Sequence, residues 1–410
     1  MEINMEHQLS PRITKFNINP CSILVGLHVL MNKLAAKNGE RSNFAFSPLS
    51  FHSMLSLIAL GSEGPTLKQM LTFMGIDGVD ELNFLASHLV SSVLLPPEND
   101  NDDISHGPIV SFVNGAWLDH RFKLKAPFEQ IVRSVYRATA KEVDFLELPD
   151  QAREEINKWA EKESRGLIRN LLPPDGIDEE TILILTNALY FRGTWSIPFD
   201  ISKTHQRDFH TLTGSAIQVP FMATDANQKH LYASSNDHQV VKMPYQTGSD
   251  HDSRRFSMCF FLPNARDGLA GLLDRIRAEP MMLNPQVAER VVSPVWIPRF
   301  KFEFEVEASS SMMELGLVLP FCDMYGLNGM VEIADEPVVL SKVFHKTMIE
   351  VNEEGTEAAG SSAGRIRGLR CRSAAPPSFV ADHPFVFTIV EENSGSVLFL
   401  GALLNPLLVS

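Results

Sequence analysis

The sequence predicts an α+β fold, and two observations lead to this prediction. Apolar residues recur with a helical period mainly in the first half of the chain, whereas strand-like runs dominate from residue 182 onward. The helical and strand-like segments do not alternate as they do in doubly wound folds. The chain has no internal repeat and no linker long enough to separate domains, so we expect residues 1–410 to form a single domain.

The predicted helices come early in the chain. Ser47-Pro48 is a helix-entry signal. An acidic, proline-bounded stretch at 96–108 indicates a solvated surface loop. The segments with helical spacing are 23–36, 49–60, 67–74 and 153–170.

The predicted strands are short apolar runs, most of them in the second half. They indicate that β-sheets form much of the core. The runs are 109–118, 182–191, 240–243, 256–262, 291–306, 385–390 and 397–402.

The composition fits a soluble globular protein with a large core, because 44% of the residues are hydrophobic and 21% are charged. Lys and Arg total 36 against 50 Asp and Glu, which gives a formal charge of −14. This acidic balance argues against nucleic acid or an anionic membrane as the main partner. No apolar stretch approaches the ~20 residues of a membrane-spanning helix.

Residues 1–20 contain no apolar run typical of a secretory signal, and we expect residues 1–15 to be disordered. The four cysteines are widely spaced and fit no metal-binding pattern: Cys21, Cys259, Cys322 and Cys371. They indicate free thiols in a reducing compartment. We therefore expect a cytoplasmic location by default, with extracellular or vacuolar release left open, and neither a metal nor a cofactor.

The most informative segment covers residues 350–379. From Thr356 to Gly368, alternate residues are small or apolar, and every charge falls on the intervening positions. This period of two is typical of a strand with one buried face. Three glycines between residues 360 and 368 make the segment a weak strand former. The pattern indicates a segment with two states, an exposed loop and a strand; a flexible linker is the alternative.

Seven motifs along the chain point to one family. Glu350-Val-Asn-Glu-Glu-Gly-Thr-Glu-Ala-Ala359 resembles the hinge of the serpins, and Phe379-Val-Ala-Asp-His-Pro-Phe-Val-Phe387 resembles the serpin signature after the reactive loop. The resemblance spans about residues 10–406, and the sequences of the motifs are similar to those of plant serpins. The other motifs are Asn43-Phe-Ala-Phe-Ser-Pro-Leu-Ser50, Thr186-Asn-Ala-Leu-Tyr-Phe-Arg-Gly-Thr-Trp195, residues 292–302, Leu340-Ser-Lys-Val-Phe-His-Lys346 and Leu398-Phe-Leu-Gly-Ala-Leu-Leu-Asn-Pro406.

The resemblance implies a serpin fold with three β-sheets, about eight or nine helices and an exposed reactive-centre loop at about 355–379. It implies a metastable inhibitor that a target endopeptidase attacks as a substrate, forming a covalent acyl complex. The cleaved loop then inserts into the central sheet and traps the protease. The residues implied as the hinge are Glu353, Gly355, Thr356, Glu357, Ala358, Ala359 and Gly360. No large charged residue lies on their inward face, so we expect insertion to be intact.

Two further sets of residues follow from the resemblance. Ser47, Ser50, Asn187 and His345 match a polar cluster beneath the sheet centre that lets the strands part. Arg299 and Glu353 match an ion pair at the base of the loop.

The bait residue, whose carboxyl side the protease cleaves, has two candidates. Counting seventeen residues from Glu353 places it at Leu369, with cleavage before Arg370. Many plant members carry Leu-Arg at the two positions ending in the bait, which shifts the reactive bond to Arg370–Cys371. We favour Arg370, because four arginines lie between residues 365 and 372. Arginine suits trypsin-like pockets and also papain-like cysteine proteases, whereas leucine suits chymotrypsin-like pockets.

Two functions other than inhibition are considered from the sequence: a non-inhibitory serpin and an enzyme. A non-inhibitory serpin, cleaved as a substrate or acting as carrier, chaperone or storage protein, is the alternative. The chain lacks a Gly-x-Ser-x-Gly elbow and an HExxH motif, which argues against an enzyme. His383 follows Asp382 directly, and in a strand the two side chains would point to opposite faces. We therefore expect a monomeric protease inhibitor with no catalytic residues, whose partner is the target endopeptidase.

Overall fold

The computed structural model describes residues 20–35, 42–89, 93, 107–226, 228–248, 254–332, 336–356 and 376–408. Within these residues it contains nine α-helices and three β-sheets, which confirms the predicted α+β class. None of the helices in this part of the chain is long and apolar enough to cross a membrane.

A six-stranded sheet contains several of the motifs. Its strand order is β12-β13-β4-β2-β3, and β14 also pairs with β4. β13 and β4 are parallel, so their carboxyl ends lie at the same end of the sheet. The strands are β12 (Phe300–Glu307), β13 (Lys342–Val351), β4 (Leu183–Thr194), β2 (Ile109–Asp119), β3 (Thr139–Val143) and β14 (Gly355–Thr356).

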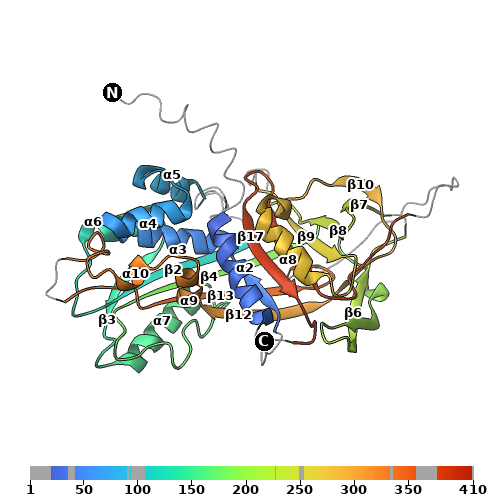
Figure 1. Cartoon of the computed structure of the whole chain (residues 1–410). Helices are drawn as coiled ribbons and strands as arrows, with labels where there is room; N and C mark the ends of the chain where they lie inside the picture. The colour runs from blue at the N-terminus through green and yellow to red at the C-terminus, as the bar shows by residue number, and fades with distance from the viewer. Residues whose placement is uncertain are drawn as a thin grey trace.

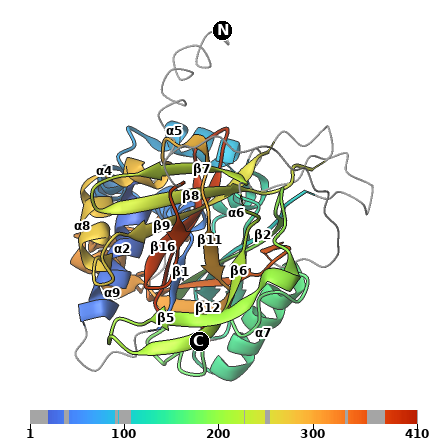
Figure 2. The ribbon, with the colours of Figure 1, turned by 90° about the vertical axis from the view of Figure 1, so that its right-hand side faces the viewer.

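The two other sheets occupy much of the opposite end of the molecule from helices α4–α6 (Figure 1). The seven-stranded sheet runs β1 (Phe44–Phe46), β17 (Val397–Leu403), β16 (Phe385–Glu391), β9 (Phe256–Pro263), β8 (His238–Pro244), β7 (Lys229–Ser234) and β10 (Ala288–Val291). The four-stranded sheet runs β15 (Phe379–Val380), β11 (Val295–Pro298), β6 (Ala216–Ala223) and β5 (His205–His210). Figure 2 looks onto the end where β5, β6 and β11 lie.

Helix α3 (Pro48–Gly61) forms the centre of the core, because almost all of its residues are buried. The Ser47 hydroxyl caps it by accepting a hydrogen bond from the Ser50 amide at 3.2 Å. It packs against β4 and β17. The remaining helices are α2 (Pro20–Ala35), α4 (Gly64–Met74), α5 (Val79–Leu89), α6 (Ala126–Ser134), α7 (Pro149–Glu163), α8 (Leu269–Ala278), α9 (Ser309–Glu314) and α10 (Leu319–Cys322).

Two predicted elements have different boundaries. The helix predicted at 153–170 ends at Glu163, because Arg165 and Gly166 adopt left-handed backbone with φ of 56° and 85°. The strand predicted at 291–306 is three strands, β10, β11 and β12, which belong to three different sheets. Pro294 and Pro298 lack the N–H group that a continuous ladder needs.

Candidate functional site

The candidate site begins where the chain turns back after β13. Gly355 and Thr356 form β14, which pairs antiparallel with β4, Gly355 opposite Thr194 and Thr356 opposite Gly193. β13 pairs with β4 only as far as Tyr190. The start of the predicted hinge therefore lies in the six-stranded sheet, beyond the point where β13 and β4 stop pairing.

Gly355 lies too close to β4 to carry a side chain. A Cβ atom at this position would collide with the backbone of Gly193 and Thr194. The close approach of the two backbones thus requires glycine at the first position of β14.

The turn before β14 is bound to the segment that follows β4. The amide of Trp195 donates to the carbonyl of Glu354 at 2.8 Å, and its indole Nε1 donates to the carbonyl of Asn352 at 3.0 Å. The amide of Phe199 donates to the carbonyl of Glu353 at 2.8 Å. These bonds fix the base of the hinge against the end of β4.

The Thr356 side chain faces inward and is only 1% exposed. Its hydroxyl forms a 2.7 Å hydrogen bond with the hydroxyl of Tyr245. The Tyr245 ring stacks on Trp195 at a centroid distance of 4.6 Å, and burial raises the pKa of the tyrosine. The space beneath the hinge at this position suits a small side chain with one hydroxyl.

The structure brings the predicted pair Arg299 and Glu353 together. Arg299 Nε lies 3.5 Å from Glu353 Oε2, and the side chains are 47% and 6% exposed. The Thr204 hydroxyl donates to Glu353 Oε1 at 2.6 Å. The carboxylate therefore has two partners. Thr204 could not be predicted as one of them, because it lies on a loop 149 residues away along the chain.

The four residues of the predicted sheet-centre cluster also meet. His345 on β13 stands directly opposite Asn187 on β4, and its Nδ1 lies 2.7 Å from Asn187 Oδ1. His345 Nε2 accepts a hydrogen bond from the Ser47 amide at 2.9 Å, and the Ser50 hydroxyl donates to Asn187 Oδ1. All four residues are fully buried. The cluster joins α3 to both central strands.

Asn114 on β2 extends this cluster. Its Oδ1 accepts from Asn187 Nδ2, and its own amide donates to the Ser53 hydroxyl at 3.0 Å. Asn114 lies directly opposite Asn187 in the β2–β4 register. Asn114 and Asn187 are polar residues within otherwise apolar strand-like runs. This was a signal in the sequence for a buried polar contact, and the prediction did not use it for Asn114.

Burial lowers the pKa of His345 to about 3 and that of His52, on α3, to about 4. The bond from the Ser47 amide has the same effect, because only an unprotonated Nε2 accepts it. Both histidines stay neutral in the folded chain at pH values where the unfolded chain binds protons.

Acid should therefore destabilise the chain before most carboxylates titrate. Below pH 6.5 each histidine removes about 1.4 kcal/mol of unfolding free energy per pH unit, until the pH reaches its folded pKa. We expect the urea midpoint to fall steadily from pH 6.5 to 4.5, and to fall less in His52→Gln. If the urea midpoint stayed constant between pH 6.5 and 4.5 in both the wild type and His52→Gln, the two histidines would not be neutral in the folded chain as described.

The predicted bait lies outside the described residues, as does the hinge beyond Thr356. This applies to Glu357, Ala358, Ala359, Gly360, Leu369, Arg370 and Cys371. The described chain resumes at residue 376, and β15 joins the four-stranded sheet by pairing parallel with β11.

The expectation for Asp382 and His383 was wrong. The two residues lie in the connection between β15 and β16, not in a strand, and His383 Nδ1 is 2.7 Å from Asp382 Oδ1. His383 Nε2 is 2.8 Å from the carbonyl oxygen of Pro263. Since both ring nitrogens are occupied, this pair does not relay a proton to a serine.

The comparisons with known proteins agree on one family. A family model described as "Serpin (serine protease inhibitor)" matches residues 28–406. Serpin-ZX of Arabidopsis thaliana is 42% identical over 375 residues, 90% of this chain and 93% of the relative. Serpin-ZXA of Oryza sativa subsp. japonica is 41% identical over 91% of this chain and 92% of its own. The solved structure described as the native stressed conformation of Arabidopsis AtSerpin1 has a TM-score of 0.85 at 38% identity, covering 97% of this chain and 99% of that one.

Proposed function

The chain belongs to the serpin family, and from this premise we propose that it is a suicide-substrate inhibitor of trypsin-like endopeptidases. Its relatives in the comparisons are plant serpins, and serpins are in general protease inhibitors rather than enzymes. The finer proposal concerns the mechanism and the target.

The observation that carries the proposal is the position of β14. Gly355 and Thr356 already pair with β4 at the end of the six-stranded sheet. Each residue added to β14 in the direction of the loop would continue along β4, between β4 and β13. The alternating small face of the loop fits this path, because those side chains would point into the core.

The covalent step belongs to the protease. Its serine Oγ attacks the carbonyl carbon of Arg370, the Arg370–Cys371 peptide bond breaks, and the Cys371 amine leaves with a proton from the catalytic histidine. An ester between the serine and Arg370 remains. The part of the loop that precedes the cleaved bond, from the hinge to Arg370, then extends β14. It carries the ester-bound protease along the sheet before water hydrolyses the ester.

The cluster around His345 is proposed to control the opening of the sheet. It links β13 and β4 through Asn187, and insertion of a strand between them must break the bond between His345 and Asn187. Such a buried polar network holds the strands together in one defined arrangement while leaving fewer apolar contacts to separate.

A substrate-like serpin is the second candidate function. Three glycines between residues 360 and 368 favour it, because they weaken the strand that must form. In this case hydrolysis of the ester outpaces insertion and the chain is cleaved without trapping.

Mixing the purified chain with trypsin, and separately with chymotrypsin, tests the proposal. We expect a denaturant-resistant band at the summed mass with trypsin, together with a released peptide that begins at Cys371. A released peptide that begins at Arg370, in an adduct with chymotrypsin, would move the bait to Leu369. Cleavage by every protease tested without an adduct would replace inhibition by the substrate-like function.

We also propose a cytoplasmic location. Three cysteines in the described part of the chain, Cys21, Cys259 and Cys322, carry free thiols, which suits a reducing compartment. Cell fractionation that recovers the protein only outside the cell would overturn this proposal.

A further inference from the structure

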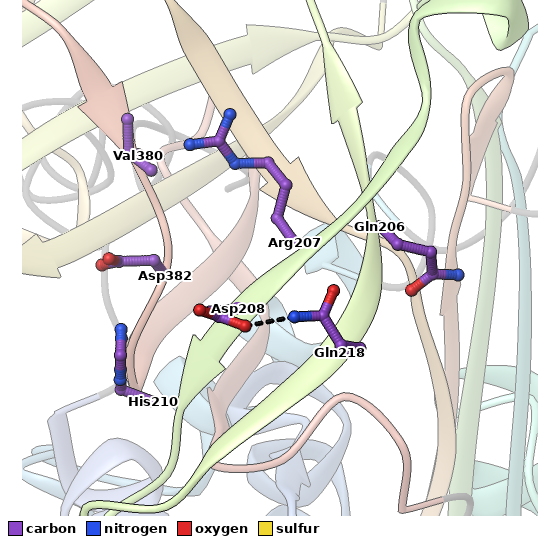
Figure 3. Close-up of a pocket in the computed structure, with 7 residues that line it drawn as sticks. All are labelled: Gln206, Arg207, Asp208, His210, Gln218, Val380 and Asp382. Carbon is purple, nitrogen blue, oxygen red and sulfur yellow. Dashed lines mark hydrogen bonds between the residues drawn. The ribbon is translucent and has the colours of Figure 1, made fainter.

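A polar hollow lies beside the base of the reactive loop. β5 and β6 form one side of it, and Val380 on β15 and Asp382 form the other (Figure 3). Because β15 is the strand into which the loop returns, this hollow adjoins the region that a protease bound to the loop would cover.

Arg207 is the distinctive residue of the hollow. Its guanidinium carbon lies 3.7 Å from the centroid of the Trp296 ring. Arg207 belongs to β5 and Trp296 to β11, so the side chain reaches across β6, which lies between these strands. Figure 3 shows the guanidinium extending toward Val380, which stands opposite Trp296 in the β11–β15 register. The cation is therefore held next to the base of the loop.

Arg207 forms no ion pair within the described structure. Arg207 is exposed, and no described carboxylate lies within ion-pair distance of it. Its neighbour Asp208 accepts a hydrogen bond from Gln218 instead. The stacked guanidinium loses little conformational freedom when it binds a carboxylate, and its five donors remain available. Arginine is one of the residue types enriched at the energetic centre of protein interfaces.

We propose that Arg207 is a docking residue for the target protease, through a carboxylate on the protease surface outside its active site. This inference rests on the proposed function. It assigns to Arg207 a role in the rate of encounter and in the choice among trypsin-like targets, and no role in loop insertion.

The covalent geometry of the chain permits this contact. Eight residue steps join Cys371 to Phe379, so the reactive bond lies at most about 29 Å from β15. A protease domain of about 230 residues has a radius of roughly 22 Å. Because the active-site cleft lies at the protease surface, the protease extends up to about 44 Å from the bond, so it is large enough to reach the end of the molecule where β5, β11 and β15 lie.

The test measures the second-order rate constant for inhibition of trypsin by wild type, Arg207→Ala and Arg207→Glu. Arg133→Ala is the matched control, because Arg133 is an exposed arginine on α6 at the opposite end of the molecule (Figure 1). We expect a decrease of about 3–10-fold for Arg207→Ala, a larger one for Arg207→Glu, and less than 1.5-fold for the control. The wild-type rate should also decrease more steeply between 50 and 300 mM NaCl than that of Arg207→Ala.

The stoichiometry of inhibition separates docking from trapping. It should be the same in wild type and in all three variants, since Arg207 acts before the covalent step. Wild type that forms the adduct while Arg207→Ala and Arg133→Ala react at equal rates would overturn the docking role and leave the proposed function intact. A raised stoichiometry in Arg207→Ala would also overturn it, by assigning the residue to insertion. Wild type that forms no adduct would overturn both proposals.

Discussion

Replacing Thr356 with arginine should convert the chain from an inhibitor into a substrate. Thr356 is the first inward-facing side chain of the hinge, and it is buried against the hydroxyl of Tyr245. In the intact chain an arginine at this position would leave the buried site and unpair the start of β14. Insertion would then have to bury its unpaired charge beneath the sheet, at a cost of several kcal/mol. Only about 3 kcal/mol added to the barrier slows insertion by roughly 100-fold, which gives the ester time to hydrolyse.

We expect the stoichiometry of trypsin inhibition to rise more than about tenfold in Thr356→Arg, with cleavage at an unchanged rate. Glu357→Arg is the matched control, because residue 357 falls on the outward side of the alternating pattern, which already carries the charges. Thr356→Ser keeps the hydroxyl and should trap as wild type does. If Thr356→Arg formed as much adduct as Glu357→Arg, the loop would not insert along β4.

The second large effect concerns the bait. Arg370→Ala should decrease the rate of trypsin inhibition by about 100-fold or more. The arginine side chain pairs with a carboxylate at the bottom of a trypsin-like pocket, and removing one partner of such a buried pair costs about 3–5 kcal/mol. Leu369→Ala should change this rate by less than tenfold, because its side chain occupies the neighbouring, more open position.

Arg372→Ala provides the control for a general loss of positive charge from the loop. Second-order rate constants with trypsin and with chymotrypsin, measured for all three variants, distinguish the two candidate bonds. If Leu369→Ala abolished inhibition of chymotrypsin while Arg370→Ala left inhibition of trypsin unchanged, the reactive bond would be Leu369–Arg370.

From the sequence, the location of an element and its buried face were predicted better than the distant segments that each element contacts. The period of two in the loop and the buried strands from residue 182 onward depend only on local alternation, so they are readable without a structure. β2, β4, β8, β9, β16 and β17 occur close to their predicted ranges. Helices α5, α6 and α8 were not predicted, although their apolar residues recur with a helical period, so this signal was left unused. Strands β5, β6 and β7 were not predicted, because their short runs mix polar and apolar residues without a clear alternation.

In the candidate site, residues that belong to motifs were predicted, whereas their contacts with distant segments were not. Glu353, Arg299 and the residues around His345 were expected from their motifs, and the structure places each set together. Tyr245 was not expected, although its hydroxyl is the direct partner of Thr356. Such contacts join segments more than 100 residues apart, and alternation along one strand carries no information on which distant segment lies beneath it.

We propose that the cleaved loop becomes a strand between β13 and β4. The most direct measurement is the thermal melting of the chain before and after cleavage between residues 357 and 375, with the cut verified by mass. Insertion adds strand pairing and buries one face of the loop. A gain of only about 5 kcal/mol would raise the melting temperature of a 410-residue chain by about 6 °C. We expect such a rise for the cleaved chain. A cleaved chain that melts at or below the temperature of the intact chain would show that the loop does not insert.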